Sequence, residues 1–183
     1  MKCALCGSDG PFENVSDRDA KSSERLLVSM CEKCGLVQQN PIPSIEELRV
    51  YYSHNYRQDY KNTYTPKPQH VYRAGKTALP RIEFLKNAGI SSGGLLDIGA
   101  GGGEFVYLAG RSGFEPTGVE PSIGYSEYAA TEYGSLVRTG ELEDIDGAYD
   151  VITMFHVMEH LPAPLRAFEK LHSLLNPDGK LFV

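Results

Sequence analysis

Four cysteines, the whole cysteine content of the chain, form two C-x-x-C pairs, CALC and CEKC, separated by 24 residues. Each pair places two thiols on a tight turn, and the interval between the pairs is long enough for a hairpin. Four thiolates are the ligand set of tetrahedral structural zinc, and such a site keeps no open position for chemistry. Gly7 and Gly35, each directly after a pair, suit turns that bring backbone N–H groups near the sulfurs. We predict a structural zinc site with the ligands Cys3, Cys6, Cys31 and Cys34.

Two alternatives stay open for these cysteines. They could be buried free thiols without a metal, or one pair could be a redox motif. Redox C-x-x-C pairs occur singly, at the start of a helix in a βαβ unit, which does not describe this N-terminal segment. A disulfide framework is not expected, because the N-terminus, MKCALCG, has no apolar signal region.

The segment LLDIGAGGGEFV, residues 95–106, places a glycine-rich bend directly after a strand-like apolar run. Such a bend can hold a pyrophosphate against backbone N–H groups, or it can hold a nucleoside that carries no phosphate. The position that would complete the dinucleotide pattern G-x-G-x-x-G is Glu104, and a carboxylate there disfavours a pyrophosphate. Asp97, at the end of the strand, adds a second acid. An acidic bend favours a cationic ligand with an amino-acid end, and we predict S-adenosylmethionine.

Two further strand ends carry acids that suit a nucleoside. Glu120, in TGVEPS, ends the next predicted strand, where a carboxylate can accept hydrogen bonds from both ribose hydroxyls. Glu141 and Leu142, in RTGELEDI, follow the third strand, where a carboxylate and a backbone N–H could read an adenine edge. An ordinary solvated acidic loop is the alternative for Glu141.

The fourth predicted strand, in YDVITMFHVMEHLPAP, is followed by His156, Glu159 and His160. Ligands of open α/β sheets bind beyond the carboxyl ends of the strands, so this cluster is expected at the same crevice as Glu120. His156 is the predicted general base, because a histidine titrates near neutral pH, and His160 and Glu159 are predicted to assist it. The alternative is that the histidines cap or pack a helix, since the three residues follow helical i, i+3, i+4 spacing.

These residues need a scaffold of parallel strands joined by helices. Alternating apolar and helical patterns predict five strands, at residues 95–98, 116–119, 136–138, 151–155 and 180–183. Ahead of them, Ser44 and Glu47 form a capping-box pattern that starts a helix through Tyr51, and a second helix is predicted at about residues 70–86. The predicted organisation is a zinc ribbon at 1–40, a helical bridge or lid at 41–90 and an α/β Rossmann-like cofactor domain at 91–183.

Composition narrows the choice of partners. The chain of 183 residues is 41% hydrophobic, as in an ordinary globular protein, and its formal net charge of -6 argues against binding nucleic acid. No apolar stretch approaches the ~20 residues of a membrane helix. We therefore expect a cytoplasmic protein that does not act at a membrane.

The segments LLDIGAGGGEFV, GVEPS and YDVITMFHVMEHL resemble the cofactor motifs of class I S-adenosylmethionine-dependent methyltransferases. The cysteine pairs, with CEKCGLVQQNPIPSIEEL and the tyrosine-rich YYSHNY, resemble the zinc-ribbon branch of that superfamily, which includes sugar C-methyltransferase-like enzymes. The resemblance implies that Glu120 holds the ribose, that Glu141 and Leu142 hold the adenine, and that Phe155 and His156 line the wall near the methyl group. It also implies that the methionine part is surrounded by Asp97, Gly99, Ala100, Gly101 and Gly103.

Two departures from the resembled family matter. Some relatives carry E-x-x-E-H after the fourth strand for metal-assisted O-methyl transfer, whereas this chain has H-x-x-E-H, a set that can still bind a metal. The sheet of the family has seven strands, and this chain stops in GKLFV, the predicted fifth. We therefore expect a fragment with five of the usual seven strands, whose open edge favours self-association and whose methyl transfer is weak or absent.

The expected activity is in-line transfer of the methyl group to a small-molecule acceptor, a sugar or another metabolite. Two other functions stay open. The chain could bind the cofactor without chemistry and act as a zinc-ribbon interaction module. It could also be an NAD-dependent enzyme, which Glu104 disfavours.

Overall fold

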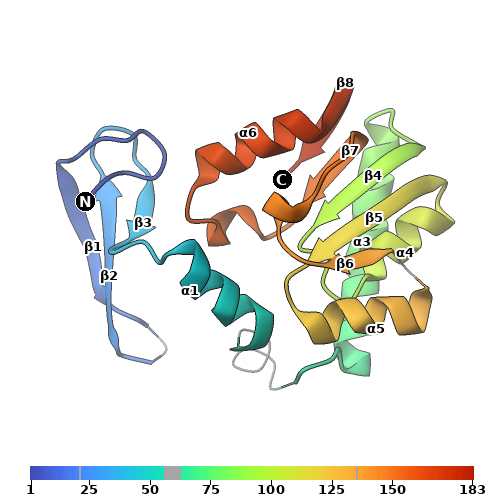
Figure 1. Cartoon of the computed structure of the whole chain (residues 1–183), viewed down its shortest axis with the longest axis horizontal. Helices are drawn as coiled ribbons and strands as arrows, with labels where there is room; N and C mark the ends of the chain where they lie inside the picture. Colours follow the sequence, from blue (N-terminus) through green and yellow to red (C-terminus); the bar gives the residue numbers. More distant parts are fainter. Residues whose placement is uncertain (21, 56–62, 135) are drawn as a thin grey trace. The chain divides into compact units, whose positions relative to one another are not determined.

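The computed structural model describes residues 1–20, 22–55, 63–134 and 136–183 (Figure 1). By their internal contacts these residues form two compact units, Met1–Leu48 with Leu161–Phe168, and Arg49–His160 with Glu169–Val183. Tyr56, the last residue of the YYSHNY motif, lies outside the described residues. In the part of the chain that the structure describes, no helix has both the length and the apolar character needed to cross a membrane.

The N-terminal unit is built on a three-stranded antiparallel sheet of β1 (Phe12–Arg18), β2 (Arg25–Cys31) and β3 (Val37–Gln39). The β1–β2 hairpin occupies the interval between the cysteine pairs, as the spacing predicts. Among the described residues of Met1–Leu48, the buried side chains are Cys3, Ser29, Cys31 and Gln38. An apolar core is therefore almost absent from this segment, and the sheet needs another source of stability.

Two helical segments follow the ribbon sheet. The first is α1 (Ile45–Val50), continued by the π-helical turn η1 (Tyr51–Asn55). Its capping box is confirmed: the Ser44 N–H donates to Glu47 Oε2 at 2.8 Å, and the Glu47 N–H donates to Ser44 Oγ at 3.2 Å. The second is the long helix α3 (Pro68–Asn87), which begins and ends within two residues of its predicted bounds.

The second unit contains a parallel sheet in the order β6-β5-β4-β7-β8 (Figure 1). Its strands are β4 (Gly93–Ile98), β5 (Phe114–Glu120), β6 (Val137–Thr139), β7 (Tyr149–Met154) and β8 (Leu175–Phe182). All five predicted strands are present, and the predicted Rossmann-like fold class is confirmed. β4 lies between β5 and β7, so the strand order reverses beside it, which is where open α/β sheets bind ligands.

The core of this unit packs α3 and α4 (Glu104–Arg111) against one face of the sheet. Leu85 of α3, Phe105 of α4, Leu95 of β4 and Val151 of β7 are buried together there. Next to this cluster, α5 (Ile123–Tyr133) packs through Ala129. The remaining helical segments are the short turns η2 (Leu142–Asp144) and η3 (Met158–His160) and the helix α6 (Pro164–Leu174). This packing fixes the carboxyl ends of β4, β5 and β7 as one edge of the sheet.

Candidate functional site

The glycine-rich bend between β4 and α4 is a tight left-handed loop. Gly99, Gly101 and Gly103 have φ values of +73°, +58° and +84°, which side chains on L-residues rarely adopt. Gly103 stands directly before α4, and a Cβ on it would lie 2.6 Å from the Ala129 Cβ. Because the predicted glycines have no side chains, the backbone of this loop is left uncovered at the carboxyl end of β4.

The Glu120 carboxylate ties this loop to the end of β5. Glu120 is buried, with Oε2 accepting the N–H of Gly101 at 2.9 Å and Oε1 accepting the N–H of Ser122 at 3.1 Å. The backbone helps as well, since the N–H groups of Gly99 and Ala100 both donate to the Val119 carbonyl, at 2.9 and 3.0 Å. Glu120 and the loop are thus one rigid assembly at the point where the strand order reverses.

Asp97, the second predicted acid, is buried at the end of β4. Its Oδ1 accepts a hydrogen bond of 2.6 Å from the Thr153 hydroxyl. Burial raises the pKa of Asp97 from 3.8 to about 7; the Thr153 hydrogen bond and the positive charge of Arg81 oppose this rise, and the charge of Glu120 adds to it. The residue beneath the loop is therefore an acid, and a cation bound nearby would favour its ionised form.

Arg81 and Thr153 are two residues of this site that the sequence analysis missed. Arg81 Cζ lies 4.0 Å from the centre of the Phe155 ring, and Phe155 meets Phe105 edge to face with ring centres 5.6 Å apart. A signal for Arg81 exists, because helical spacing places it on the buried side of α3, next to Ile82. Thr153 lies within the apolar run of β7, so its sequence neighbours give no sign that its hydroxyl has a role.

Glu141 and Leu142 lie just after β6, as predicted, but Glu141 has a partner within the chain. Glu141 Oε2 is 3.3 Å from Nη2 of Arg49, and the Glu141 N–H donates to Asp144 Oδ2 at 2.9 Å. Leu142 is buried and begins the turn η2. An adenine role for Glu141 stays a prediction, and binding through its carboxylate would have to share or displace Arg49.

The predicted catalytic cluster after β7 does not form a helical face. His156 is the second residue past the strand and has φ +58°, so the chain bends before η3 begins. The side chain of His156 is 82% exposed, and its Nδ1 lies 3.7 Å from Oε1 of Glu159. His160 is also exposed and meets the ring of Tyr52 edge to face, with ring centres 5.7 Å apart. The helical arrangement that the i, i+3, i+4 spacing predicts is wrong here, because the chain bends with a left-handed φ at His156 and then forms a 3₁₀ turn.

The four cysteines converge on one point of the N-terminal unit. Their sulfurs all lie within 4.8 Å of one another, with Cys3 to Cys34 at 3.5 Å and Cys6 to Cys31 at 3.7 Å. Tetrahedral zinc with bonds of about 2.3 Å would place its sulfurs about 3.8 Å apart. Across residues 1–20, 22–55, 63–134 and 136–183 this is the one group of three or more potential ligands, so His156, Glu159 and His160 are not gathered for a metal.

The backbone of the cysteine turns supports this convergence. Gly7 and Gly35 have φ +69° and +77°, and their N–H groups donate to the carbonyls of Cys3 and Cys31 at 3.0 and 2.8 Å. Burial raises the pKa of Cys3, but hydrogen bonds from the Cys6 and Leu5 backbone and from the Cys34 and Cys6 thiols outweigh this rise and lower the pKa from 9.0 to about 6. The cluster therefore favours at least one thiolate, the form that binds zinc.

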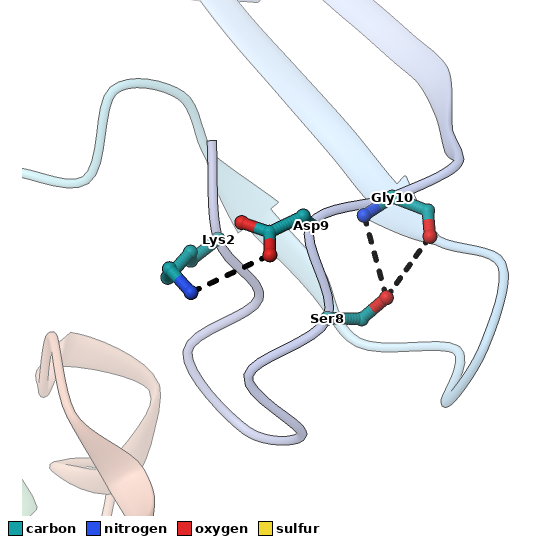
Figure 2. Close-up of polar contacts among 4 residues, drawn as sticks. All are labelled: Lys2, Ser8, Asp9 and Gly10. Atoms are coloured by element: carbon teal, nitrogen blue, oxygen red, sulfur yellow. Dashed lines mark hydrogen bonds and ion pairs between the residues drawn. The ribbon is translucent and has the colours of Figure 1, made fainter.

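Side chains outside the cysteines hold the first turn in place. The Gln38 amide brackets Cys3, because its Nε2 donates to the Lys2 carbonyl at 3.0 Å and its Oε1 accepts the Ala4 N–H at 2.9 Å. Figure 2 shows the loop that follows the turn. There the Ser8 hydroxyl donates to the Gly10 carbonyl at 2.9 Å, and Lys2 Nζ lies 3.4 Å from Asp9 Oδ2. The exposed ion pair contributes little, so Gln38 is the main side-chain support.

Comparison with known proteins gives one matching family and a set of relatives. A family model described as a methyltransferase domain matches residues 70–183, more than half of the chain. The ubiquinone biosynthesis O-methyltransferase of Pseudomonas aeruginosa (strain LESB58) is 28% identical over 115 residues, which cover 56% of this chain and 49% of that protein. The enzyme of the same name from Actinobacillus pleuropneumoniae serotype 5b (strain L20) is 32% identical over 117 residues, 56% and 50% of the two chains. The chain thus spans about half the length of the curated relatives it matches.

Solved structures show the same fold. Magnesium protoporphyrin IX methyltransferase from Synechocystis PCC 6803 with bound S-adenosylhomocysteine superposes with a TM-score of 0.58 at 20% identity, over 73% of this chain and 68% of that chain. A second solved structure, from Methanococcus maripaludis, gives a TM-score of 0.51 at 19% identity, over 62% of this chain and 61% of that chain. At these identities the likeness concerns the fold alone.

Proposed function

We propose that this chain, which belongs to the methyltransferase-domain family whose model matches residues 70–183, binds S-adenosylmethionine and transfers its methyl group to a small-molecule acceptor. The relatives with aligned sequence are methyltransferases. Because the chain spans about half of their length, the activity itself is our proposal for this protein.

The contact between Glu120 and Gly101 carries the proposal. It fixes a buried carboxylate at the end of β5, directly beside the bare glycine loop after β4. A carboxylate offers about four acceptor positions, so an oxygen that holds a backbone N–H can also accept a hydroxyl. Two ribose hydroxyls donating to Glu120 would therefore bind a nucleoside against a loop that is already in place.

The acids of the site favour a cation over a pyrophosphate. Asp97 is buried beneath the loop, and Glu104, at the first residue of α4, is buried as well. A phosphate at the start of α4 would face the Glu104 carboxylate, which costs binding energy. The sulfonium and ammonium groups of S-adenosylmethionine are cations, so the same acids favour them. This argues against an NAD-dependent enzyme.

The bound cofactor would supply an electrophilic methyl group. In-line transfer to an acceptor oxygen would form an O–CH₃ bond, break the S–CH₃ bond of the cofactor and leave the bonding electrons on sulfur. The acceptor must lose a proton, and we propose that His156 takes it. His156 follows β7, at the same edge of the sheet as Glu120, and its exposed imidazole is open to an acceptor. Glu159 Oε1 lies 3.7 Å from His156 Nδ1, so Glu159 would help to orient the imidazole.

We propose an oxygen nucleophile on a small metabolite, because the curated relatives named above are O-methyltransferases. The sugar acceptor implied by the zinc-ribbon resemblance has no counterpart among those relatives. We keep the structural zinc at Cys3, Cys6, Cys31 and Cys34 as part of the proposal, supported by the spacing of the four sulfurs.

Calorimetric titration of the full chain with S-adenosylmethionine and with NAD tests the cofactor. Binding of the first and not the second supports the proposal, and the reverse result overturns it. Transfer of a labelled methyl group to a panel of phenols, catechols and sugars tests the chemistry. Tight cofactor binding with no transfer to any acceptor would instead favour the non-catalytic interaction module.

A further inference from the structure

We propose that Thr153 is a positioning residue for the cofactor: its hydroxyl orients the Asp97 carboxylate and keeps that carboxylate able to carry charge when the cofactor binds. The inference rests on the proposed function, and it assigns a role to a residue of β7 that belongs to no recognisable sequence motif. Figure 1 shows β7 and β4 side by side in the sheet.

The register of the two strands places the pair together. β4 and β7 are parallel neighbours, and Asp97 lies directly opposite Thr153. Thr153 is fully buried and Asp97 is 4% exposed, so bulk water does not replace the contact between them. The Thr153 hydroxyl has one proton to give. It lies 2.6 Å from Asp97 Oδ1 and 3.4 Å from the Leu96 carbonyl, so the shorter contact to Asp97 takes that proton.

Three residues from three elements act on the charge of Asp97. Thr153 on β7 stabilises the carboxylate by donating a hydrogen bond. Arg81 on α3 stabilises it through its positive charge, and Glu120 on β5 destabilises it through its negative charge. The guanidinium of Arg81 also lies over the Phe155 ring, so Arg81 interacts with that ring as well as with Asp97. Thr153 is therefore the one of the three that binds Asp97 by a short, directed contact.

The role of Thr153 follows from the charge of the cofactor. A ligand with an ammonium and a sulfonium group binds the ionised Asp97 more tightly than the protonated form. Since burial raises the pKa of Asp97 to about 7, part of the free protein is protonated at neutral pH and must lose that proton on binding. Cofactor affinity should then rise with pH and level off above about pH 8. Removing the Thr153 hydrogen bond would raise the pKa of Asp97 further and weaken binding at neutral pH.

Thr153→Val tests this with S-adenosylhomocysteine, which keeps the ammonium group but has no methyl group to transfer. Losing a hydrogen bond to a charged group should raise the pKa of Asp97 by about one unit or more. For one unit, affinity relative to wild type falls about ninefold at pH 6, about fivefold at pH 7 and by less than about 1.2-fold at pH 9. Thr153→Ser keeps the hydroxyl and should restore the wild-type profile.

The matched control is Thr117→Val on β5. The Thr117 hydroxyl oxygen is buried and has no hydrogen-bond partner among the residues that the structure describes. This variant should leave affinity unchanged at every pH. A loss in Thr153→Val that is the same at pH 6 and pH 9, or that Thr153→Ser fails to rescue, would overturn the proposal and indicate a packing defect.

A second measurement needs no cofactor and separates this inference from the proposed function. Thermal unfolding is followed from pH 4 to pH 9 for wild type, Thr153→Val, Asp97→Asn and the double variant. Thr153→Val should extend the pH-dependent loss of stability to higher pH in the wild-type background, because it raises the native pKa of Asp97 and leaves the unfolded pKa unchanged. In the Asp97→Asn background it should cause no such shift. If the ligand fails to bind wild type at any pH, the proposed function fails. If the unfolding curves show no shift, the assignment of Thr153 fails.

Discussion

The Gly101 N–H donates to the Glu120 carboxylate over 2.9 Å and so joins the loop after β4 to the end of β5. Replacing Glu120 with Ala removes this acceptor together with the one that holds the Ser122 N–H. Titration with S-adenosylmethionine should show binding weakened by about 1.5 to 3 kcal/mol, the range for hydrogen bonds to a charged group.

Glu120→Gln is a second test of the same contacts. An amide has one oxygen, so its NH₂ group must face either Gly101 or Ser122, and one backbone N–H loses its acceptor. We expect affinity close to that of Glu120→Ala. Glu115→Ala, an exposed acid on the same strand, is the control and should bind like wild type. Equal losses at Glu115 and Glu120 would mean that neither acid contacts the ribose.

The central strands β4 and β7 could be predicted from the sequence because the last four residues of each are buried and read as largely apolar runs. The capping box of Ser44 and Glu47 could be predicted because it depends on residues three apart. Arg81, Thr153 and Asp97 come together only through tertiary packing of α3, β7 and β4. Their separations along the sequence match neither the helical nor the strand period, so no local sequence pattern indicates that the three residues lie together.

The cluster after β7 illustrates a different limit. The spacing of His156, Glu159 and His160 fits a helix. His156 nevertheless has φ +58°, a value more often found at Gly or Asn. The chain turns at that residue, so the two histidines meet different neighbours: Glu159 for His156 and Tyr52 for His160.

Metal analysis of the purified chain should find about one zinc per molecule. The described residues of Met1–Leu48 bury almost no apolar side chain besides Cys3 and Cys31, so we expect zinc to supply most of the stability of this segment. Cys34→Ser should lose zinc, and Lys33→Ser, next to it on the same turn, should keep it. A metal-free preparation whose ribbon amides stay protected from hydrogen exchange would refute the site.

Asp97 should give the protein a measurable pH dependence of stability. Its pKa rises from 3.8 to about 7 on folding, so between these values the native state holds a proton that the unfolded chain releases. The free energy of unfolding therefore falls as pH rises from about 4 to 7, by up to about 1.4 kcal/mol per pH unit from this group, and then levels off.

Asp97→Asn removes this titration and keeps an oxygen that can accept the Thr153 hydroxyl. The difference in stability between Asp97→Asn and wild type should grow in favour of the variant from pH 4 to pH 7 and stay constant above. Asp178→Asn, an exposed aspartate of β8, serves as the control and should follow wild type across this range. A constant difference between Asp97→Asn and wild type at all pH values would show that Asp97 keeps an ordinary pKa in the fold.

His156→Gln addresses the proposed base once a methyl acceptor is known. Glutamine keeps hydrogen bonding but cannot take the acceptor proton at neutral pH. Turnover should fall on the order of 10²-fold or more, with cofactor affinity little changed, because His156 is expected to act on the acceptor. The acid limb of the pH–rate profile should also disappear, since the group whose protonation stops the reaction is gone.

Glu159→Gln and His172→Gln complete this test of the base. The contact of Glu159 with His156 is long, at 3.7 Å, and both side chains are more than half exposed, so the pair is worth about 1 kcal/mol at most. Glu159→Gln should therefore slow turnover by no more than about fivefold. His172→Gln, an exposed histidine of α6, should have no effect. If His156→Gln keeps the wild-type pH–rate profile, the proton goes elsewhere. His160 would then be the residue to replace, because it lies at the same strand end and is also exposed.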